Sequence, residues 1–298
     1  MKIGYPCINQ SIGKKTVSTF RLSSYNEERL IRSINYNLDT LNEILNYNIK
    51  NDLMFFRVSS NMIPFASHPI CKFDWKDYFK SEFINIGQLI KKHNIRISMH
   101  PDQFVLINAK NQDIVDKSIK ELEYHNDLLD LMQLDTSAKI QIHVGGVYGD
   151  KQESIKRFIL IYKNLLSDEI KKRLVIENDD HLYNLNTCLE IHSNIGIPII
   201  LDTFHHECFG NNLSLIDALH KANSTWNYHK DGVLMIDYSN QEPNQRKGKH
   251  SNILDMKKFL QFIHSIKDID LDIMLEIKDK EKSAKKAKIL IDQINSSN

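Results

Sequence analysis

The sequence predicts an α/β protein built as a single-domain (β/α)8 TIM barrel over residues 1–298. Eight short apolar, β-branched runs recur along the chain, and stretches with helical spacing separate them. A chain of 298 residues with 41% hydrophobic content can also bury one large core. Eight strand–helix units are the number that closes such a barrel.

The predicted strands are near-continuous apolar runs, which indicates burial on both faces, as in a parallel sheet covered by helices. In chain order they cover residues 2–5, 53–58, 95–99, 140–144, 174–176, 197–201, 233–236 and 273–277.

Helical spacing is clearest in two of the stretches that separate or follow the strands. Strand and helix alternate throughout, so an open doubly wound sheet is the other architecture that this pattern allows. No GxGxxG or Walker-type loop follows a strand, which disfavours that sheet and a nucleotide cofactor. The helical positions are Val115, Ile119, Leu122, Leu129 and Met132, and then Ala284, Ala287, Ile291 and Ile294.

The charge, the cysteines and the lengths of the apolar runs disfavour several classes of protein. The 39 Lys and Arg against 38 Asp and Glu leave a net charge of +1, so contact with nucleic acid would depend on local patches or metal ions. Cys7, Cys71, Cys188 and Cys208 form no CxxC pair, which disfavours disulfides and a structural zinc cluster. No apolar run has the length of a signal peptide core or a membrane span. We therefore expect a cytoplasmic protein without membrane contact, acting as a monomer.

Polar residues follow the predicted strands at the end where a TIM barrel carries its active site. Residues 98–104 read Ser-Met-His-Pro-Asp-Gln-Phe, and residues 141–146 read Gln-Ile-His-Val-Gly-Gly. Residues 177–180 read Glu-Asn-Asp-Asp, residues 201–207 read Leu-Asp-Thr-Phe-His-His-Glu, and residues 274–279 read Met-Leu-Glu-Ile-Lys-Asp. Because these strand ends meet at one rim, their side chains are predicted to converge.

Imidazole and carboxylate ligands together suit Mn²⁺, Zn²⁺ or Fe²⁺ better than Ca²⁺, which prefers oxygen alone. The candidates are too many for one ion, so two or three divalent ions are expected. Closely spaced ions are the standard device for phosphodiester hydrolysis. The predicted reaction is metal-assisted phosphoryl transfer to water.

The same motifs give the chain a specific resemblance. Gly4-Tyr5-Pro6 with Asn9 comes first, followed in order by Ser-Met-His-Pro-Asp-Gln-Phe, Ile-His-Val-Gly-Gly, Glu-Asn-Asp-Asp and Asp-x-x-His-His. In this order they resemble the UV damage endonuclease family. The resemblance implies a manganese-dependent TIM barrel that nicks damaged double-stranded DNA immediately 5′ of UV photoproducts, and of other lesions.

The resemblance also implies residue roles. Gln103 and Phe104 match a pair that probes the damaged site, where an extruded lesion leaves a gap to fill. Tyr5 and Asn9 are expected close to the flipped nucleotides. Glu177 and Glu276 are expected to be essential for catalysis. The implied metal ligands are His68, His100, His143, Glu177, Asp202, His205, His250 and Glu276.

The predicted seventh strand departs from the family pattern, in which a Lys and a His stand two residues apart. Met235 and Asp237 occupy these positions here. Asp237 is a competent ligand in place of the His, whereas Met235 cannot replace an amine. The number of ions therefore stays open between two and three.

Cations near the loops are candidates for contacts with DNA phosphates. They are Arg57, Arg246, Lys247 and Lys249.

Three other functions remain open. An apurinic-site endonuclease of the endonuclease IV type uses a similar ligand set, although Gln103-Phe104 and the Gly4-Tyr5 opening favour the UV enzyme. A sugar isomerase of the xylose isomerase type has a metal shell richer in carboxylates and poorer in histidine. A non-enzymatic barrel that recruits other proteins to damaged DNA would bind lesions without nicking the strand.

Overall fold

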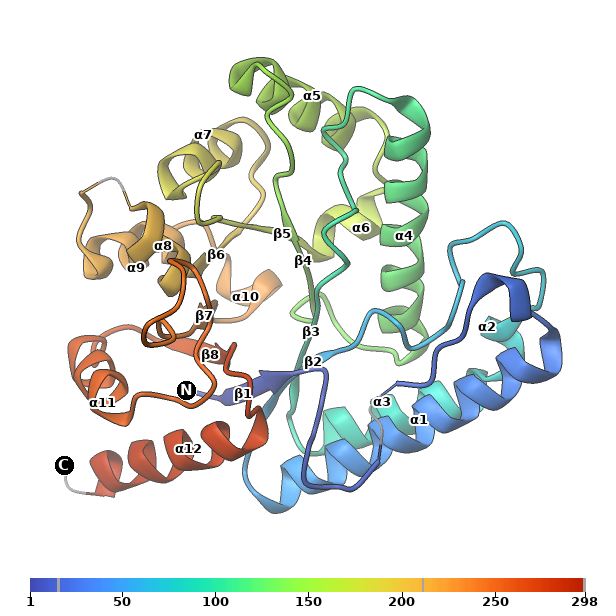
Figure 1. Cartoon of the computed structure of the whole chain (residues 1–298), viewed down its shortest axis with the longest axis horizontal. Coiled ribbons are helices and arrows are strands. Elements are labelled where there is room, and N and C mark those ends of the chain that lie inside the picture. Colours follow the sequence, from blue (N-terminus) through green and yellow to red (C-terminus); the bar gives the residue numbers. More distant parts are fainter. Residues whose placement is uncertain (15–16, 211, 297–298) are drawn as a thin grey trace.

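Eight parallel strands close into a barrel in the order β1 to β8, with β8 paired back to β1 (Figure 1). The computed structural model describes residues 1–14, 17–210 and 212–296. The predicted TIM barrel is confirmed. The strands are β1 (Ile3–Pro6), β2 (Phe55–Val58), β3 (Arg96–Met99), β4 (Lys139–His143), β5 (Leu174–Glu177), β6 (Ile199–Asp202), β7 (Leu234–Tyr238) and β8 (Leu271–Leu275).

Helices surround the barrel and connect successive strands (Figure 1). Many begin at a side chain that accepts a hydrogen bond from a backbone amide, such as Asn26 before α1 and Ser167 before α6. None of the described helices is both long enough and apolar enough to cross a lipid bilayer. The helices are η1 (Leu22–Ser24), α1 (Glu27–Lys50), α2 (Trp75–Tyr78), α3 (Lys80–Lys92), α4 (Gln112–Leu131), α5 (Lys151–Asn164), α6 (Asp168–Arg173), α7 (Leu185–Ile195), α8 (Thr203–Phe209), α9 (Leu215–Asn223), α10 (Tyr228–Asp231), α11 (Met256–Ser265) and α12 (Glu281–Ser296).

Buried ion pairs at the N-terminal end of the barrel explain two strand starts that the sequence prediction placed too late. Strand β8 begins at Leu271. The sequence prediction started it at residue 273, because Asp272 interrupts the apolar run. The Asp272 carboxylate is nevertheless buried and accepts a hydrogen bond of 2.8 Å from Arg96 on β3. Lys139 begins β4 in the same way and pairs with buried Asp231. A charge inside a strand is tolerated when its partner is buried with it.

Gly4 is required where β1 meets β2. It lies opposite Phe55 in the register, and a Cβ atom at this position would stand 1.7 Å from the backbone oxygen of Phe55. Only a residue without a side chain permits that approach.

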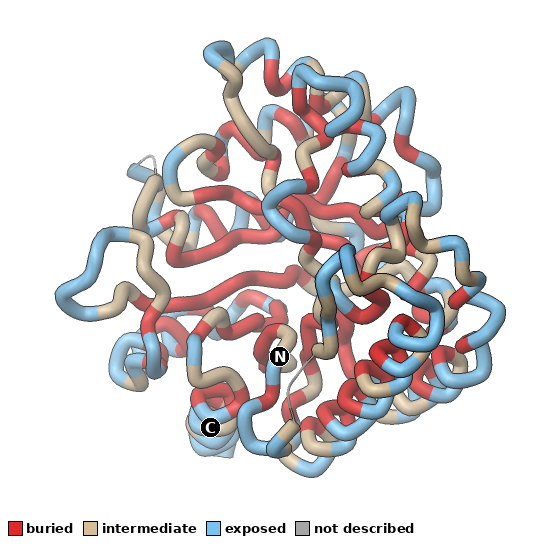
Figure 2. The backbone as a smooth tube through the Cα atoms, turned by 45° about the vertical axis from the view of Figure 1, so that its right-hand side comes forward, coloured by how far each residue is buried: buried red, intermediate tan, exposed pale blue. Residues whose placement is uncertain are grey.

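An apolar layer fills the barrel interior below the strand ends. The strands themselves are buried, and the exposed backbone is confined to loops and to the outer faces of helices (Figure 2). Met235, which departs from the family pattern, is 1% exposed and belongs to this layer. It is therefore a packing residue that forms part of the floor beneath the polar strand ends. The layer consists of Phe55, Val175, Ile200, Met235 and Met274.

Candidate active site

A polar layer lies directly above the apolar one. Side chains two residues apart on a strand point to the same face, so the residues that follow the apolar layer by two positions also face the barrel interior. On β2, Phe55 is followed by Arg57, and on β5 Val175 is followed by Glu177. The same step leads to Asp202 on β6, Asp237 on β7 and Glu276 after β8, and Gln141 completes the layer from β4.

Glu177 is the centre of this layer. Its side chain is almost fully buried, and its Oε2 atom lies 3.2 Å from Nε2 of His100 and 3.6 Å from Nε2 of His143. Its Oε1 atom lies 3.0 Å from Nδ1 of His205. Burial alone would raise the pKa of Glu177, but the surrounding histidines hold it well below its usual value. Glu177 is therefore an ionised carboxylate shared by three imidazoles.

His205 is a cation in the metal-free protein. Burial opposes its charge, but the carboxylates of Asp202 and Glu177 raise the pKa of His205 to about 11. Nδ1 of His205 lies 3.4 Å from Oδ2 of Asp202. Burial raises the pKa of Asp202 to about 6, against the attraction of His205. One oxygen of Asp202 caps α8 by accepting a hydrogen bond from the His205 amide, so the other oxygen is left for the site.

Arg57 and Gln141 hold the other side of the polar layer. Nη2 of Arg57 donates to Oδ1 of Asp237 at 2.6 Å and to Oε1 of Gln141 at 2.9 Å, and Nη1 pairs with Glu276. The amide of Gln141 donates to Oε2 of Glu177 and to Oδ2 of Asp237, each at 2.6 Å. Burial favours a neutral Glu276, but Arg57 brings the pKa of Glu276 down to about 2. This network fixes the orientation of three carboxylates.

The sequence prediction missed both of these residues as parts of the site. Arg57 was predicted as a candidate for phosphate contact near the loops, but it is 2% exposed, and its two terminal nitrogens bind the carboxylates of Asp237 and Glu276. Gln141 was not predicted because an amide is not a metal ligand of the kind expected. The signal that would have found them is the two-residue strand period, which puts Arg57 above Phe55 and Gln141 two residues before His143.

Ligand atoms converge in three linked groups. Within each group of the described residues the atoms lie within 4.8 Å of one another. Glu177 belongs to the first and second groups, and Asp202 belongs to the second and third. The groups are His100, His143 and Glu177, then Glu177, Asp202 and His205, and then Asp202, Asp237 and Glu276.

His250 and His68 differ in their relation to these groups. Nδ1 of His250 lies 3.7 Å from Oε2 of Glu276, at the edge of the third group. Nδ1 of His68 instead accepts a hydrogen bond from the amide of Ile70 at 3.1 Å, and its ring packs edge-on against Phe65. Of the predicted ligands in the described part of the chain, His68 is the one without a close partner among the other predicted ligands.

A fourth group, Asp179, Asp180 and His181, has the residue types of a metal site but is a turn. Oδ1 of Asp179 accepts hydrogen bonds from the amides of His181, Leu182 and Tyr183. Asp180 pairs with the exposed ring of His181. These contacts give one oxygen of each carboxylate a partner within the turn.

The four predicted lesion contacts divide into two pairs. Gln103 is exposed, and Phe104 is 73% exposed in the loop after β3. Tyr5 and Asn9 are completely buried, which differs from the contact expected of them. The Tyr5 hydroxyl donates to Asn48 at 2.6 Å and accepts from the Asn9 amide at 2.7 Å. In this structure Tyr5 and Asn9 pack the end of β1 and have no surface that DNA could touch.

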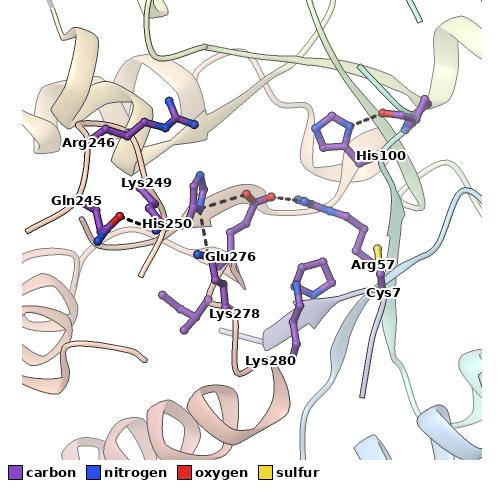
Figure 3. A pocket seen from close by; sticks show the side chains of 14 residues that line it. Cys7, Arg57, His100, Gln245, Arg246, Lys249, His250, Glu276, Lys278 and Lys280 are labelled. Atoms are coloured by element: carbon purple, nitrogen blue, oxygen red, sulfur yellow. Dashed lines mark hydrogen bonds and ion pairs between the residues drawn. The ribbon is translucent and has the colours of Figure 1, made fainter. Parts of the chain in front are cut away.

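The polar layer opens into a cavity of about 840 Å³ (Figure 3). Arg57, His100, His250 and Glu276 line its inner wall, and Glu276 pairs with both His250 and Arg57 there. A second cavity of about 440 Å³ shares His100 with the first and is also lined by Gln103, His143 and His205. Five of the candidate ligands therefore line at least one of these two cavities: His100, His143, His205, His250 and Glu276.

Comparisons with known proteins identify the family of the chain. The chain matches the family described as UV-endonuclease UvdE over residues 1–295. A UV DNA damage endonuclease of Clostridium perfringens (strain 13 / Type A) is 40% identical over 296 residues, which cover 99% of this chain and 72% of that protein. A protein of the same name from Bacillus cereus (strain G9842) is 34% identical over 257 residues, covering 86% of this chain and 80% of that one.

Solved structures give the same result. The crystal structure of SacUVDE superposes with a TM-score of 0.94 at 44% identity and covers 99% of both chains. Endonuclease IV from Thermus thermophilus superposes with a TM-score of 0.58 at 11% identity, covering 85% of this chain and 94% of that one. At such low identity the second likeness shows the fold alone. The whole-length matches confirm the resemblance that the motifs indicated: the chain belongs to the UV-endonuclease UvdE family and is a DNA repair endonuclease that acts on damaged DNA.

Proposed function

We propose that this endonuclease depends on divalent metal ions, with Mn²⁺ as the preferred ion, and nicks the backbone immediately 5′ of UV photoproducts. The observation that carries the proposal is the chain of three ligand groups joined through Glu177 and Asp202. Groups that share a carboxylate suit closely spaced ions, and such ions suit hydrolysis of a phosphodiester.

The donor atoms fit a metal in two respects. Oδ2 of Asp202 is buried without a hydrogen-bond partner among the described residues, which is costly unless a cation completes it. A mixed set of imidazole and carboxylate ligands favours Mn²⁺, Zn²⁺ or Fe²⁺ over Ca²⁺. The family resemblance favours Mn²⁺ among these.

We assign one ion to His100, His143 and Glu177 and a second to Glu177, Asp202 and His205. Bound divalent ions lower the pKa of water and neutralise the charge that develops on the phosphate, which is what phosphodiester hydrolysis requires.

A third ion would lie beside Asp202, Asp237 and Glu276, with His250 at its edge. The guanidinium of Arg57 already contacts Asp237 and Glu276, so it supplies part of the positive charge there.

Glu177 and Glu276 act as ligands in this proposal. Both have a pKa below the usual carboxylate value, so both stay ionised at neutral pH. An acid with a pKa of about 2 is a weak proton acceptor, which makes Glu276 a poor general base. Gln141 and Arg57 keep the two carboxylates in place while DNA binds.

Gln103 and Phe104 are proposed as the lesion probe. A large aromatic side chain that is 73% exposed has no role in the core. A photoproduct weakens base stacking, so less work is needed to extrude it, and an aromatic ring can stack in its place. We propose that Tyr5 and Asn9 act indirectly, by fixing the end of β1.

A plasmid assay tests the function as a whole. Supercoiled DNA exposed to UV should be nicked with Mn²⁺ present, nicking should stop with chelator, and unirradiated plasmid should stay largely intact. An oligonucleotide with one photoproduct, labelled at its 5′ end, should give a product that ends at the base before the lesion.

Two results would overturn this assignment. Faster incision at an abasic site than at the photoproduct would favour the endonuclease IV type of activity. Retention of irradiated DNA without any nicking in Mn²⁺ would favour a recruitment module.

Metal binding should release protons, because His205 carries one in the metal-free protein and a ligating nitrogen must be free of it. The pKa of His205 is raised to about 11, so the proton is present throughout the neutral range and must be displaced. The apparent Mn²⁺ affinity should therefore rise with pH, by up to about tenfold per unit for one proton.

Calorimetry in two buffers of different ionisation enthalpy, at a pH of about 7.5, measures the number of protons released. His205→Ala should lower it by about one, whereas His264→Gln, on the exposed face of α11, should leave it unchanged. Equal proton release by the wild type and His205→Ala would contradict the assignment of His205.

A further inference from the structure

Four cations line one side of the active-site cavity without belonging to the ligand groups or to the network around Arg57. Arg246 and Lys249 come from the loop between β7 and α11, and Lys278 and Lys280 come from the loop after β8 (Figure 3). We call these four residues the basic rim. Glu276 lines the same cavity, so the basic rim lies beside the candidate ligands.

The basic rim has no counter-ions of its own. Within the described part of the chain, none of its four side chains forms an ion pair with a carboxylate. Lys249 donates to the neutral amide of Gln245, at 2.7 Å. The buried cations Arg57, Arg96 and Lys139 are all paired with acids. The charge of the basic rim is thus available to an external anion.

The other side of the site has the opposite character. The cavity of about 440 Å³ that shares His100 with the first is lined by Asp102, Asp179 and Asp180, and by no Lys or Arg of the described residues. The lysines and arginines of the mouth therefore gather on the side of the basic rim. A polyanion that approaches the site is drawn first to the basic rim.

The loop that carries Arg246 and Lys249 is held in shape by its own hydrogen bonds. Gln241 pairs with His250 in an antiparallel bridge, and its side chain accepts from the amide of Gly248 and donates to the carbonyl of Arg246, each at 2.9 Å. The amide of Lys278 donates to the carbonyl of Ser251, which ties the second loop to the first. The cations are therefore presented on a preformed frame, which lowers the entropy lost on binding.

We propose that the basic rim binds backbone phosphates of the DNA substrate, so that the strand to be cut crosses the β7–β8 side of the barrel mouth. The proposal rests on the action of this family on damaged DNA. With a net charge of +1, the chain as a whole attracts DNA weakly, so the local unpaired cations supply the electrostatic attraction.

Binding of a labelled duplex in chelator tests the proposal without any cleavage. The logarithm of the binding constant should fall linearly with the logarithm of salt concentration, by about 0.9 for each phosphate contacted. The double variant Arg246→Gln/Lys278→Gln should lower that slope by about 2 and weaken binding at low salt. Arg246→Lys/Lys278→Arg should keep the slope.

Lys221→Gln/Lys286→Gln is the matched control, since both lysines are exposed on outer helices. It removes the same charge and should leave the slope unchanged. The proposal is overturned if the rim variant keeps the wild-type slope, or if the control lowers it equally. The binding experiment is run without metal and measures no cleavage. Its result therefore holds even if a separate assay finds no UV-specific nicking, which would contradict the proposed function alone.

Discussion

Glu177→Gln is expected to lower the rate of Mn²⁺-dependent nicking on the order of a thousandfold or more. The amide has the size of the carboxylate but no charge, and Glu177 lies within 3.0 to 3.6 Å of His100, His143 and His205. Both ligand groups that contain Glu177 lose their shared anion, so the variant should also bind less Mn²⁺. The loss exceeds that of an ordinary surface change because Glu177 is buried and belongs to two ligand groups.

Supercoiled-plasmid nicking measures the rate, and elemental analysis of the purified protein measures the metal content. Glu190→Gln on the exposed face of α7 is the control, because it makes the same chemical change away from the site. A Glu177→Gln protein that nicks irradiated plasmid at the wild-type rate would remove Glu177 from the mechanism.

Arg57→Met is expected to lower the free energy of unfolding of the metal-free protein by about 3–5 kcal/mol. Its guanidinium is the one cation that contacts Asp237, which is 1% exposed, among the described ion pairs. Removing the partner leaves a buried carboxylate without compensation, and burial already raises the pKa of Asp237 well above its usual value. Most of the lost stability comes from the unpaired carboxylate of Asp237. The Glu276 side chain keeps 22% of its surface in water, so its charge costs less when Arg57 is removed.

Urea unfolding in chelator measures this effect, with Arg32→Met on the exposed face of α1 as the control. Adding Asp237→Asn to Arg57→Met should recover part of the lost stability, since the unpaired charge is then gone. A loss below about 1 kcal/mol in the single variant would show that the pair is not what holds this part of the barrel together.

Both predicted variants, Glu177→Gln and Arg57→Met, change the charge balance of the same polar layer. Glu177 is compensated by His205, whose proton a bound metal ion would displace in the proposed mechanism, whereas Asp237 is compensated by a guanidinium that stays charged at any pH in the working range. The site therefore combines exchangeable and permanent positive charge. That combination lets the metal-free protein fold with several carboxylates buried at the strand ends.

Much of the candidate site could be predicted from the sequence, because strand ends of a parallel barrel must meet at one rim. His100, His143, Glu177, Asp202 and His205 come together as that rule requires. His68 could not be placed in the same way, because its loop follows no repeating geometry and turns the ring toward Phe65 and Ile70. The ligand roles of all these residues stay predictions until metal is measured.

The sequence by itself determined the fold class, the rim at which polar residues gather and the family, since all three depend on local pattern and on the order of motifs along the chain. Only the tertiary structure decided which polar side chains bind partners inside the barrel and which face the mouth of the cavity. Arg57 became an internal counter-ion, Tyr5 became core, and Arg246 and Lys278 at the mouth form no ion pair with any residue that the structure describes. The reason is physical: a charge is compensated by whatever lies within a few ångströms of it, and those neighbours come from strands and loops that are distant in the sequence.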